Sequence, residues 1–258
     1  MLHSVTEGTG RRVVLVHGFT QTAEAWGPVA ERLAARFQLV RVDAPSHGRS
    51  TAVRAGLWEG AALLGAAGGP AAYVGYSMGG RLVLHLALTE PHRVERVVVL
   101  GATAGIDDPA ERAARRSADD ALAASLEADG LDAFLTRWLA QPLLAGLPDD
   151  AAALAARRAN TVEGLASSLR LAGTGSVDPP LWDRLGELAM PVLVLAGEHD
   201  AKFAALGQRL AAAIGPNASF ALVPGAGHAA HLERPDAFLA LVEPFLDGSV
   251  TPRGPGRP

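Results

Sequence analysis

Five short apolar runs rich in valine, separated by segments with helical patterns, constrain the fold of this chain most strongly. The runs lie at residues 12–17 (RVVLVH), 38–43 (QLVRVD), 71–76 (AAYVGY), 94–101 (VERVVVLG) and 191–198 (PVLVLAGE). Such runs are typical of strands buried on both faces of a parallel sheet. Helical patterns follow at 28–37, 78–89 and, after a last short strand near 219–223, at 235–246. The alternation predicts an α/β fold with a mostly parallel central sheet and flanking helices.

The alternation of strand and helix stops between residues 105 and 188. Helical patterns cover 119–128, 131–139, 149–160 and 162–171 there, with no strand pattern among them. We therefore expect one domain with a core of residues 1–104 and 189–248 and an inserted helical lid of residues 105–188. Residues 249–258 are dense in proline, glycine and arginine and predict a disordered tail.

Charge and composition exclude several classes of partner. The net charge is −4, whereas nucleic acids and anionic membranes attract clustered positive charge. No apolar run reaches the roughly 18 residues of a membrane span, and the first residues lack a signal-peptide pattern. With no cysteine, no H-E-x-x-H and no G-x-G-x-x-G after a strand, we expect neither a metal nor a cofactor. The prediction is a cytoplasmic protein that acts on a small molecule, with a monomer as the default.

The pentapeptide Gly75-Tyr76-Ser77-Met78-Gly79 lies between a predicted strand and a predicted helix. In that context a G-x-S-x-G sequence forms a sharp turn that projects the serine hydroxyl into a cleft, the nucleophile elbow of the α/β-hydrolase fold. The flanking glycines let the strand and the helix approach each other. Ser77 is therefore the predicted reactive residue.

A serine hydroxyl needs an imidazole to take its proton and a carboxylate to fix the tautomer of that imidazole. Asp200 follows the strand at 191–198, and His228 lies in the loop after the last strand. The order Ser, Asp, His along the chain matches the α/β-hydrolase fold. We therefore predict Ser77, Asp200 and His228 as the catalytic triad.

Other residues compete for two of these roles. His199 and His231 are the alternatives to His228, and Glu198 and Asp183 are the alternatives to Asp200. Triad geometry favours His228, and Glu198 points to the opposite side of an extended chain from its neighbour.

The oxyanion hole of this fold takes one backbone N–H from the loop after an early strand and one from the residue after the nucleophile. His17-Gly18-Phe19 ends the run at 12–17, so Phe19 and Met78 are the expected donors. His17 is either a pocket residue or a buried structural histidine.

Several longer segments resemble one family in particular. They are Gly75–Arg81 (GYSMGGR), 111–119 (ERAARRSAD), 138–142 (WLAQP), 157–160 (RRAN), 197–203 (GEHDAKF) and 227–235 (GHAAHLERP). With these segments the chain resembles the 2-succinyl-6-hydroxy-2,4-cyclohexadiene-1-carboxylate synthases of menaquinone (vitamin K2) biosynthesis, non-hydrolytic members of the α/β-hydrolase superfamily. The resemblance covers nearly the whole chain except the tail. The lid segments carry the most weight because lids diverge fastest in this superfamily.

The resemblance implies a carbon–oxygen lyase that eliminates pyruvate from 2-succinyl-5-enolpyruvyl-6-hydroxy-3-cyclohexene-1-carboxylate. The Ser-His-Asp relay would remove a proton from the substrate, which carries three carboxylates. By the resemblance, arginines at Arg81, Arg115 and Arg158 hold these groups, as bidentate guanidinium groups do well. Arg81 also lies four residues after Ser77, on the same helix face. Further pocket residues would be Tyr76, Trp138, His17 and Lys202.

The chain departs from the family pattern at two places that bear on substrate handling. They are Asp43–Gly48 (DAPSHG), where relatives usually have Leu-Pro-Gly-His-Gly, and Leu139, a position that can be tyrosine. The main alternative function is a serine hydrolase of esters or carbon–carbon bonds with the same triad. A third hypothesis is an inactive binding module.

Overall fold

The computed structural model describes residues 1–148 and 150–250, so most of the predicted tail lies outside the described residues. Within these residues, seven strands form one sheet in the order β1-β3-β2-β4-β5-β6-β7. Their bounds are β1 Ser4–Glu7, β2 Arg12–Val16, β3 Gln38–Val42, β4 Ala71–Tyr76, β5 Val94–Leu100, β6 Val192–Gly197 and β7 Ala218–Val223. All pairings are parallel except that of β1 with β3, which places an antiparallel strand at one edge.

Ten α-helices accompany the sheet in the described part of the chain. They are α1 Gly27–Ala34, α2 Leu57–Gly68, α3 Met78–Thr89, α4 Pro109–Asp129, α5 Leu131–Leu139, α6 Ala151–Arg157, α7 Val162–Ala172, α8 Ala201–Ile214, α9 Ala230–Glu233 and α10 Pro235–Asp247. The strand–helix pattern of the sequence predicts neither α2 nor α8, and it begins α4 ten residues too late. Asp108 caps α4 by accepting a hydrogen bond from the Glu111 N–H at 2.8 Å.

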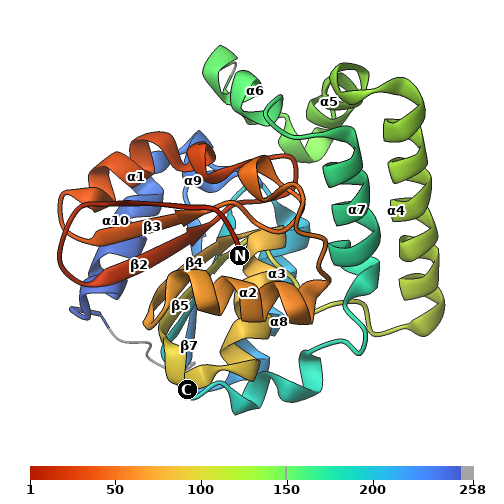
Figure 1. Cartoon of the computed structure of the whole chain (residues 1–258). Coiled ribbons are helices and arrows are strands. Elements are labelled where there is room, and N and C mark those ends of the chain that lie inside the picture. Colours follow the sequence, from red (N-terminus) through yellow and green to blue (C-terminus); the bar gives the residue numbers. More distant parts are fainter. Residues whose placement is uncertain (149, 251–258) are drawn as a thin grey trace.

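Successive residues of each strand point to opposite faces of the sheet, and each face has its own helical layer. Val14 and Val16 of β2 pack into the cluster that contains residues of α2, α3 and α8. Val13 and Leu15 pack into the cluster that contains residues of α1 and α10. The sheet therefore lies between two helical layers, as Figure 1 shows.

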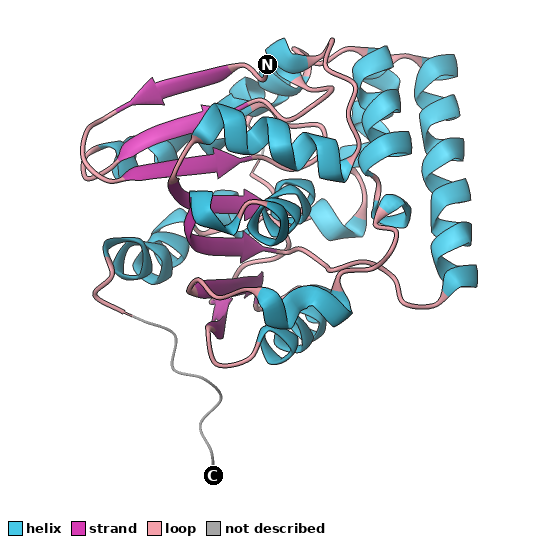
Figure 2. Cartoon of the chain, turned by 60° about the horizontal axis from the view of Figure 1, so that its bottom comes forward, coloured by secondary structure: helices cyan, strands magenta, loops and turns pink. Residues whose placement is uncertain are grey.

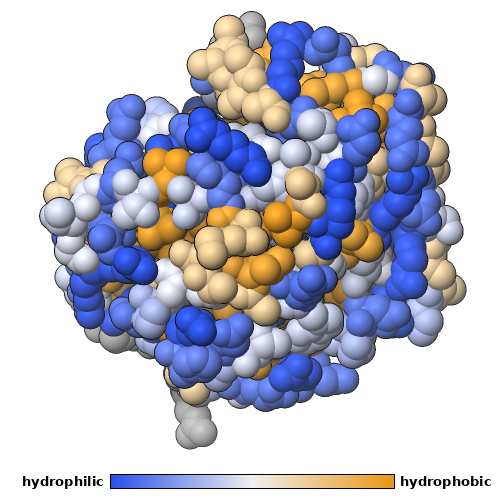
Figure 3. All heavy atoms as spheres, in the orientation of Figure 1, coloured by the Kyte–Doolittle hydropathy of each residue, from blue (hydrophilic) through white to orange (hydrophobic). Residues whose placement is uncertain are grey.

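Helices α4 to α7 follow β5 and stand beside the sheet rather than on its faces (Figure 1). Between β5 and β6 the described residues form helices and no strand. Phe134 of α5 and Leu165 of α7 belong to a small separate apolar cluster that also includes Leu126 of α4. Hydrophilic side chains cover the outer edge of α4 in the surface view (Figure 3). These helices thus have a core of their own.

The parallel strands all point toward these helices, while β1 runs the other way (Figure 2). The carboxyl ends of the parallel strands therefore meet beneath α4 to α7. Loops at that edge of an open α/β sheet carry ligand sites in many folds. No helix in the described residues combines the length and the apolar character needed to cross a bilayer.

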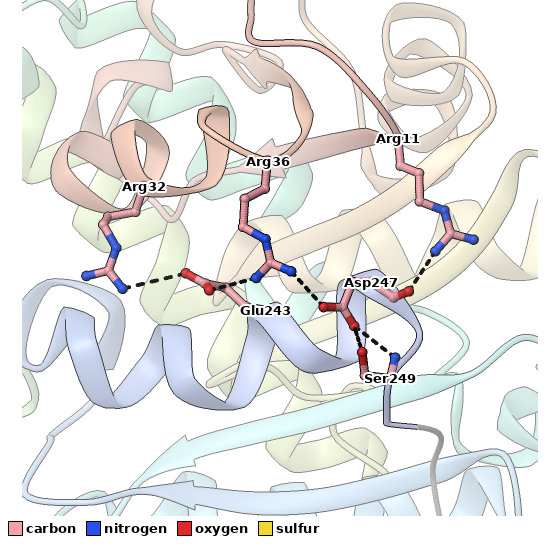
Figure 4. Close-up of polar contacts among 6 residues, drawn as sticks. All are labelled: Arg11, Arg32, Arg36, Glu243, Asp247 and Ser249. Atoms are coloured by element: carbon pink, nitrogen blue, oxygen red, sulfur yellow. Dashed lines mark hydrogen bonds and ion pairs between the residues drawn. The ribbon is translucent and has the colours of Figure 1, made fainter.

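Ion pairs connect α1 and the residues that follow it to α10, in the helical layer on one face of the sheet. Arg36 binds Glu243 at 3.0 Å and Asp247 at 2.8 Å, and Arg32 lies 3.7 Å from Glu243 (Figure 4). The Arg11 guanidinium adds a hydrogen bond to the backbone oxygen of Asp247. Since the Arg32 and Arg36 side chains are about half exposed, each pair contributes little to stability. The apolar contacts between the two helices and the sheet dominate this layer.

Four histidines are fully buried within the fold: His17, His47, His85 and His231. Burial is the largest cause that lowers their pKa values, to about 4 for His17 and His85 and to about 3 for His47 and His231. All four are therefore neutral in the folded protein at neutral pH.

We expect these histidines to make the protein less stable in mild acid. In the unfolded chain they take up protons below their ordinary pKa of 6.5, while the folded protein does not until about pH 3 to 4. The free energy of unfolding therefore falls as the pH drops from 6.5, by about 2 kcal/mol per histidine at pH 5. His231→Phe should remove one histidine's share of this slope. Urea unfolding between pH 5 and pH 7 tests this, and an unchanged slope in the variant would contradict it.

Candidate active site

Ser77 occupies a strained turn between β4 and α3. Its backbone angles are φ 51° and ψ −107°, a left-handed conformation that is uncommon for a residue with a side chain. A Cβ on Gly75 would lie 2.5 Å from the Gly79 carbonyl oxygen, and one on Gly79 would lie 2.2 Å from the Val16 carbonyl oxygen. The two glycines of the pentapeptide thus allow β4, α3 and β2 to come together where the serine is held.

His228 and Asp200 reach Ser77 from loops at the same edge of the sheet. Asp200 follows β6 and caps α8, with its Oδ1 accepting a hydrogen bond from the Phe203 N–H at 3.2 Å. Its Oδ2 lies 2.6 Å from His228 Nδ1, and His228 Nε2 lies 3.4 Å from Ser77 Oγ. With Nδ1–H donating to the carboxylate, Nε2 is left as an acceptor for the serine proton. The structure therefore brings the three predicted residues into contact.

The imidazole of His228 is also held by packing. The Phe203 ring lies 4.4 Å from it between centroids, and the Tyr76 ring lies 5.4 Å away. Gly101 approaches closely, since a Cβ there would lie 2.9 Å from His228 Cε1. These contacts restrict the ring to the orientation in which it faces Ser77.

The competing residues have other surroundings. Glu198 accepts a hydrogen bond from the Gly225 N–H at 2.7 Å, and the His199 and Asp183 side chains are exposed. His231 is buried with its ring 4.5 Å from that of Tyr76, and neither of its ring nitrogens has a partner among the described residues. None of the four is placed in the Ser77–His228–Asp200 chain of contacts.

Phe19 and Met78, whose backbone N–H groups are the predicted oxyanion-hole donors, both line the same cavity as Ser77. Neither N–H donates a hydrogen bond to any residue that the structure describes. Both N–H groups are thus without a partner among the described residues, as the donors of an oxyanion hole must be.

The cavity lies between the sheet edge and helices α4 to α7. Ser77, His228 and Tyr76 line its floor, and Trp138 of α5 is among the residues from the other side. Four cationic side chains also line it: Arg81, Arg115, Arg157 and Lys202. Of the described residues that line the cavity, Asp119 is the only one with a carboxylate. The cavity is therefore suited to an anionic molecule with several acidic groups.

Arg81 is one of the two buried cations of the lining, with 8% of the residue exposed against 6% for Arg157. Its Nη2 donates to the backbone oxygen of Ala172 at 2.8 Å, and its buried Nε has no partner among the described residues. Burial lowers the pKa of Arg81 to about 10, so the group still carries its charge at neutral pH. A cation with an unused donor at this depth is expected where a ligand anion binds.

Arg158 does not reach the cavity, contrary to the prediction, and Arg157 does. The Arg158 side chain is 53% exposed and its Nε donates to Asp132 at 2.6 Å. Arg157 is buried with Nη1 bonded to the Thr20 hydroxyl, and burial lowers its pKa. Residues that follow each other on a helix point about 100° apart, and here Arg157 points inward and Arg158 points outward. The apolar Leu154 marks the inner face of α6, but positions three and four residues later both lie near that face.

His17 is also a predicted pocket residue, but it is absent from the cavity lining. Its Nε2 accepts from the Ala44 N–H at 3.0 Å, and its Nδ1 bonds the Gly18 backbone oxygen at 2.8 Å. Both ring nitrogens are thus used to hold two loops together, which is the structural alternative for this residue. Tyr76, Trp138, Arg115 and Lys202 do line the cavity.

The sequence prediction gave no role to Asp119, Gln21 or Phe203, which also line the cavity. Asp119 lies inside a segment that carries the family resemblance, and its spacing of four residues from Arg115 is the signal that could have singled it out. No three His, Asp or Glu side chains gather as a metal site anywhere in residues 1–148 and 150–250.

Comparison with known proteins places these features in a family. The sequence model of the alpha/beta hydrolase family matches residues 13–241, and the chain belongs to that family. A putative 2-succinyl-6-hydroxy-2,4-cyclohexadiene-1-carboxylate synthase of Bacillus subtilis (strain 168) is 35% identical, over 91% of this chain and 89% of the relative. The synthase of that name from Escherichia coli O1:K1 / APEC is 32% identical, over 91% of this chain and 93% of the relative.

The structure of MenH from S. aureus has a TM-score of 0.88 and 28% identity, over 96% of this chain and 99% of that chain. Within the alpha/beta hydrolases, the chain is thus a member of the 2-succinyl-6-hydroxy-2,4-cyclohexadiene-1-carboxylate synthase family. The fold class and the family expected from the sequence are confirmed.

The close backbone contact at the elbow yields a test. Gly79→Ala would push a methyl group against the Val16 backbone, so we expect it to lower the free energy of unfolding by about 1–3 kcal/mol or more. Gly186→Ala is the matched control, because the nearest atom to its added Cβ is 4.0 Å away, and it should change stability by less than about 0.5 kcal/mol. Urea denaturation measures both, and equal effects would contradict the steric account.

Proposed function

We propose that this chain is a lyase of menaquinone biosynthesis that eliminates pyruvate from 2-succinyl-5-enolpyruvyl-6-hydroxy-3-cyclohexene-1-carboxylate. The product is 2-succinyl-6-hydroxy-2,4-cyclohexadiene-1-carboxylate, which the names of its relatives contain. The observation that carries the proposal is the cavity itself, in which the Ser77–His228 pair faces a space lined by four cations. A small molecule with three carboxylates is the ligand that such charge complements.

The relay would remove the proton from the ring carbon next to the succinyl ketone. His228 Nε2 takes the hydroxyl proton of Ser77, and Ser77 Oγ takes the proton from the carbon. The electron pair of that C–H bond forms a ring double bond, and the existing double bond moves by one position. The bond between the ring carbon and the enolpyruvyl oxygen then breaks, and its electron pair stays on the oxygen. The released enolpyruvate takes up a proton and becomes pyruvate.

The backbone N–H groups of Phe19 and Met78 would stabilise the negative charge that develops on the ketone oxygen when the proton leaves the ring carbon. One such donor commonly contributes about 10²–10³ in rate. Asp200 holds His228 in the tautomer that accepts a proton and stabilises the imidazolium that forms. No acyl-enzyme occurs in this scheme, so Ser77 carries a proton and does not attack a carbonyl group.

The cations would divide the carboxylates of the substrate among them. Arg81 and Arg157 approach from the inner walls, and Arg115 and Lys202 from the more exposed side. Arg157 takes the role that the sequence assigned to Arg158. The cytoplasmic location and the monomeric state stay predictions from the sequence.

A serine hydrolase with the same triad is the second candidate, because the contacts among Ser77, His228 and Asp200 serve both reactions. The cationic lining favours the polyanionic substrate over a neutral ester. An inactive binding module would have no need of an aligned triad.

The decisive assay supplies the enolpyruvyl substrate, made freshly by the enzyme that precedes it in the pathway, and follows the release of pyruvate. We expect turnover by the wild type and a loss of about 10²–10⁴-fold in Ser77→Ala, because the variant lacks the proton carrier. Circular dichroism of the variant controls for folding. Near-normal pyruvate release by Ser77→Ala would remove the relay from the mechanism, and rapid hydrolysis of a simple ester without pyruvate release would favour the hydrolase.

Arg157, the last residue of α6, and Arg158, which follows it, form a matched pair of variants. Arg157→Ala should lower kcat/KM for pyruvate release by about 10- to 100-fold, the usual effect of losing a hydrogen bond to a charged group. Arg158→Ala should leave kcat/KM within about twofold, since its partner is the exposed Asp132. Steady-state kinetics distinguish them, and a larger loss in Arg158→Ala would restore the assignment made from the sequence.

A further inference from the structure

Asp119 is an unexpected residue in a cavity that would bind carboxylates. It lies on α4 with its side chain 5% exposed, and it is the only carboxylate among the described residues of the lining. A negative charge there repels an anionic ligand unless it has another task. Its position therefore calls for a physical explanation.

The contacts of Asp119 lead to Arg115. The two residues are four apart on α4 and so share one face of the helix, with Arg115 Nε 2.9 Å from Asp119 Oδ1. The Arg115 side chain is itself 42% exposed. Without a fixed partner, a long side chain at such a position loses its orientation to rotamer entropy.

The bond uses only Nε of Arg115. Its two terminal nitrogens have no partner among the described residues, and Arg115 lines the cavity. Those two nitrogens form the end of the guanidinium that can bind both oxygens of a carboxylate. The contact with Asp119 thus directs one edge of the guanidinium and leaves the other free for a ligand.

Asp119 is held more firmly than the arginine that it binds. Its carboxylate packs against Gly173, where an added Cβ would lie 2.4 Å from Oδ2. Oδ2 is buried and is the only side-chain oxygen among the buried, unpartnered side-chain atoms of the described residues. Because the packing prevents Asp119 from following Arg115 toward solvent, Asp119 is the fixed member of the pair.

We propose that Asp119 is a positioning residue that holds the free end of Arg115 toward the cavity and so raises the affinity for the carboxylates of the substrate. The inference rests on the proposed function. It assigns Asp119 an effect on binding that passes through Arg115, and no part in moving the proton. The repulsion between Asp119 and the substrate is smaller than this gain because Arg115 neutralises the carboxylate.

The test compares Asp119→Asn with Arg115→Ala and with the double variant. Asparagine keeps the size that fits against Gly173 and removes the charge. We expect Asp119→Asn to raise KM for pyruvate release by about tenfold, with kcat within about twofold. On this inference the double variant should be no worse than Arg115→Ala alone, because the effect of Asp119 on binding passes through that arginine. Asp132→Asn, which breaks the Arg158–Asp132 pair outside the cavity, is the matched control and should change neither constant.

Three results would overturn the inference. They are a KM that falls in Asp119→Asn, a loss confined to kcat, and losses that add fully in the double variant. The first would show that repulsion dominates, the second would indicate an effect on catalysis and not on binding, and the third would show that Asp119 acts independently of Arg115.

A binding measurement separates this inference from the proposed function. Calorimetric titration with 2-succinylbenzoate, a stable keto-dicarboxylate, needs no turnover. Weaker binding by Asp119→Asn and by Arg115→Ala, with Asp132→Asn unchanged, would support the pair even if the wild type released no pyruvate. Equal dissociation constants for the wild type and Asp119→Asn, or no binding to the wild type, would overturn the inference.

Discussion

The approach of α3 to the carboxyl edge of the parallel sheet decides where the functional side chains of this protein lie. It requires bare backbone at Gly75 and Gly79, since side chains there would collide with carbonyl oxygens of neighbouring elements. The turn so formed holds Ser77 with a positive φ and presents it at the edge where β6 and β7 also end. Asp200 and His228 need only the first residues after their strands to reach it. The contact between helix and sheet thus places three residues that are far apart in the sequence.

The charge of the cavity lining distinguishes this site from other sites that have the same triad. The triad geometry serves many reactions, but a cavity lined by Arg81, Arg115, Arg157 and Lys202 favours a polyanion. The buried cations Arg81 and Arg157 have few partners in the protein that compensate their charge. Their burial costs free energy in the ligand-free protein, and binding of an anion offsets that cost. Asp119 offsets part of that cost at Arg115 and, on our account, fixes the direction of its free nitrogens.

Sequence patterns predict the features of this protein that depend on neighbouring residues and on the order of motifs along the chain. Buried strands show as valine-rich runs, and the elbow, the acid and the base follow the chain order of the fold. The edge strand β1 is missed because four half-exposed residues carry little pattern. Helix α2 is missed because its alanines, leucines and glycines are apolar on every side, whereas α8 does carry Leu206, Leu210 and Ile214 at helical spacing.

The side chains that face the cavity depend on tertiary contacts and are harder to predict. Arg157 and Arg158 are adjacent and chemically identical, so only the packing of α6 against Thr20 separates them. His17 has the residue type and the place of a pocket residue, but two backbone partners hold it away from the cavity. The role of Asp119 depends on its contact with Gly173, 54 residues later in the chain.

The central claim is that Ser77 and His228 remove a proton from carbon and form no covalent bond to the substrate. Its most direct test is the single-turnover rate with substrate that carries deuterium on the ring carbon next to the succinyl ketone. The account predicts a severalfold slower release of pyruvate from the deuterated substrate, because the C–H bond breaks in the chemical step. Equal rates for the two substrates, with the substrate bound covalently to Ser77 during turnover, would contradict it.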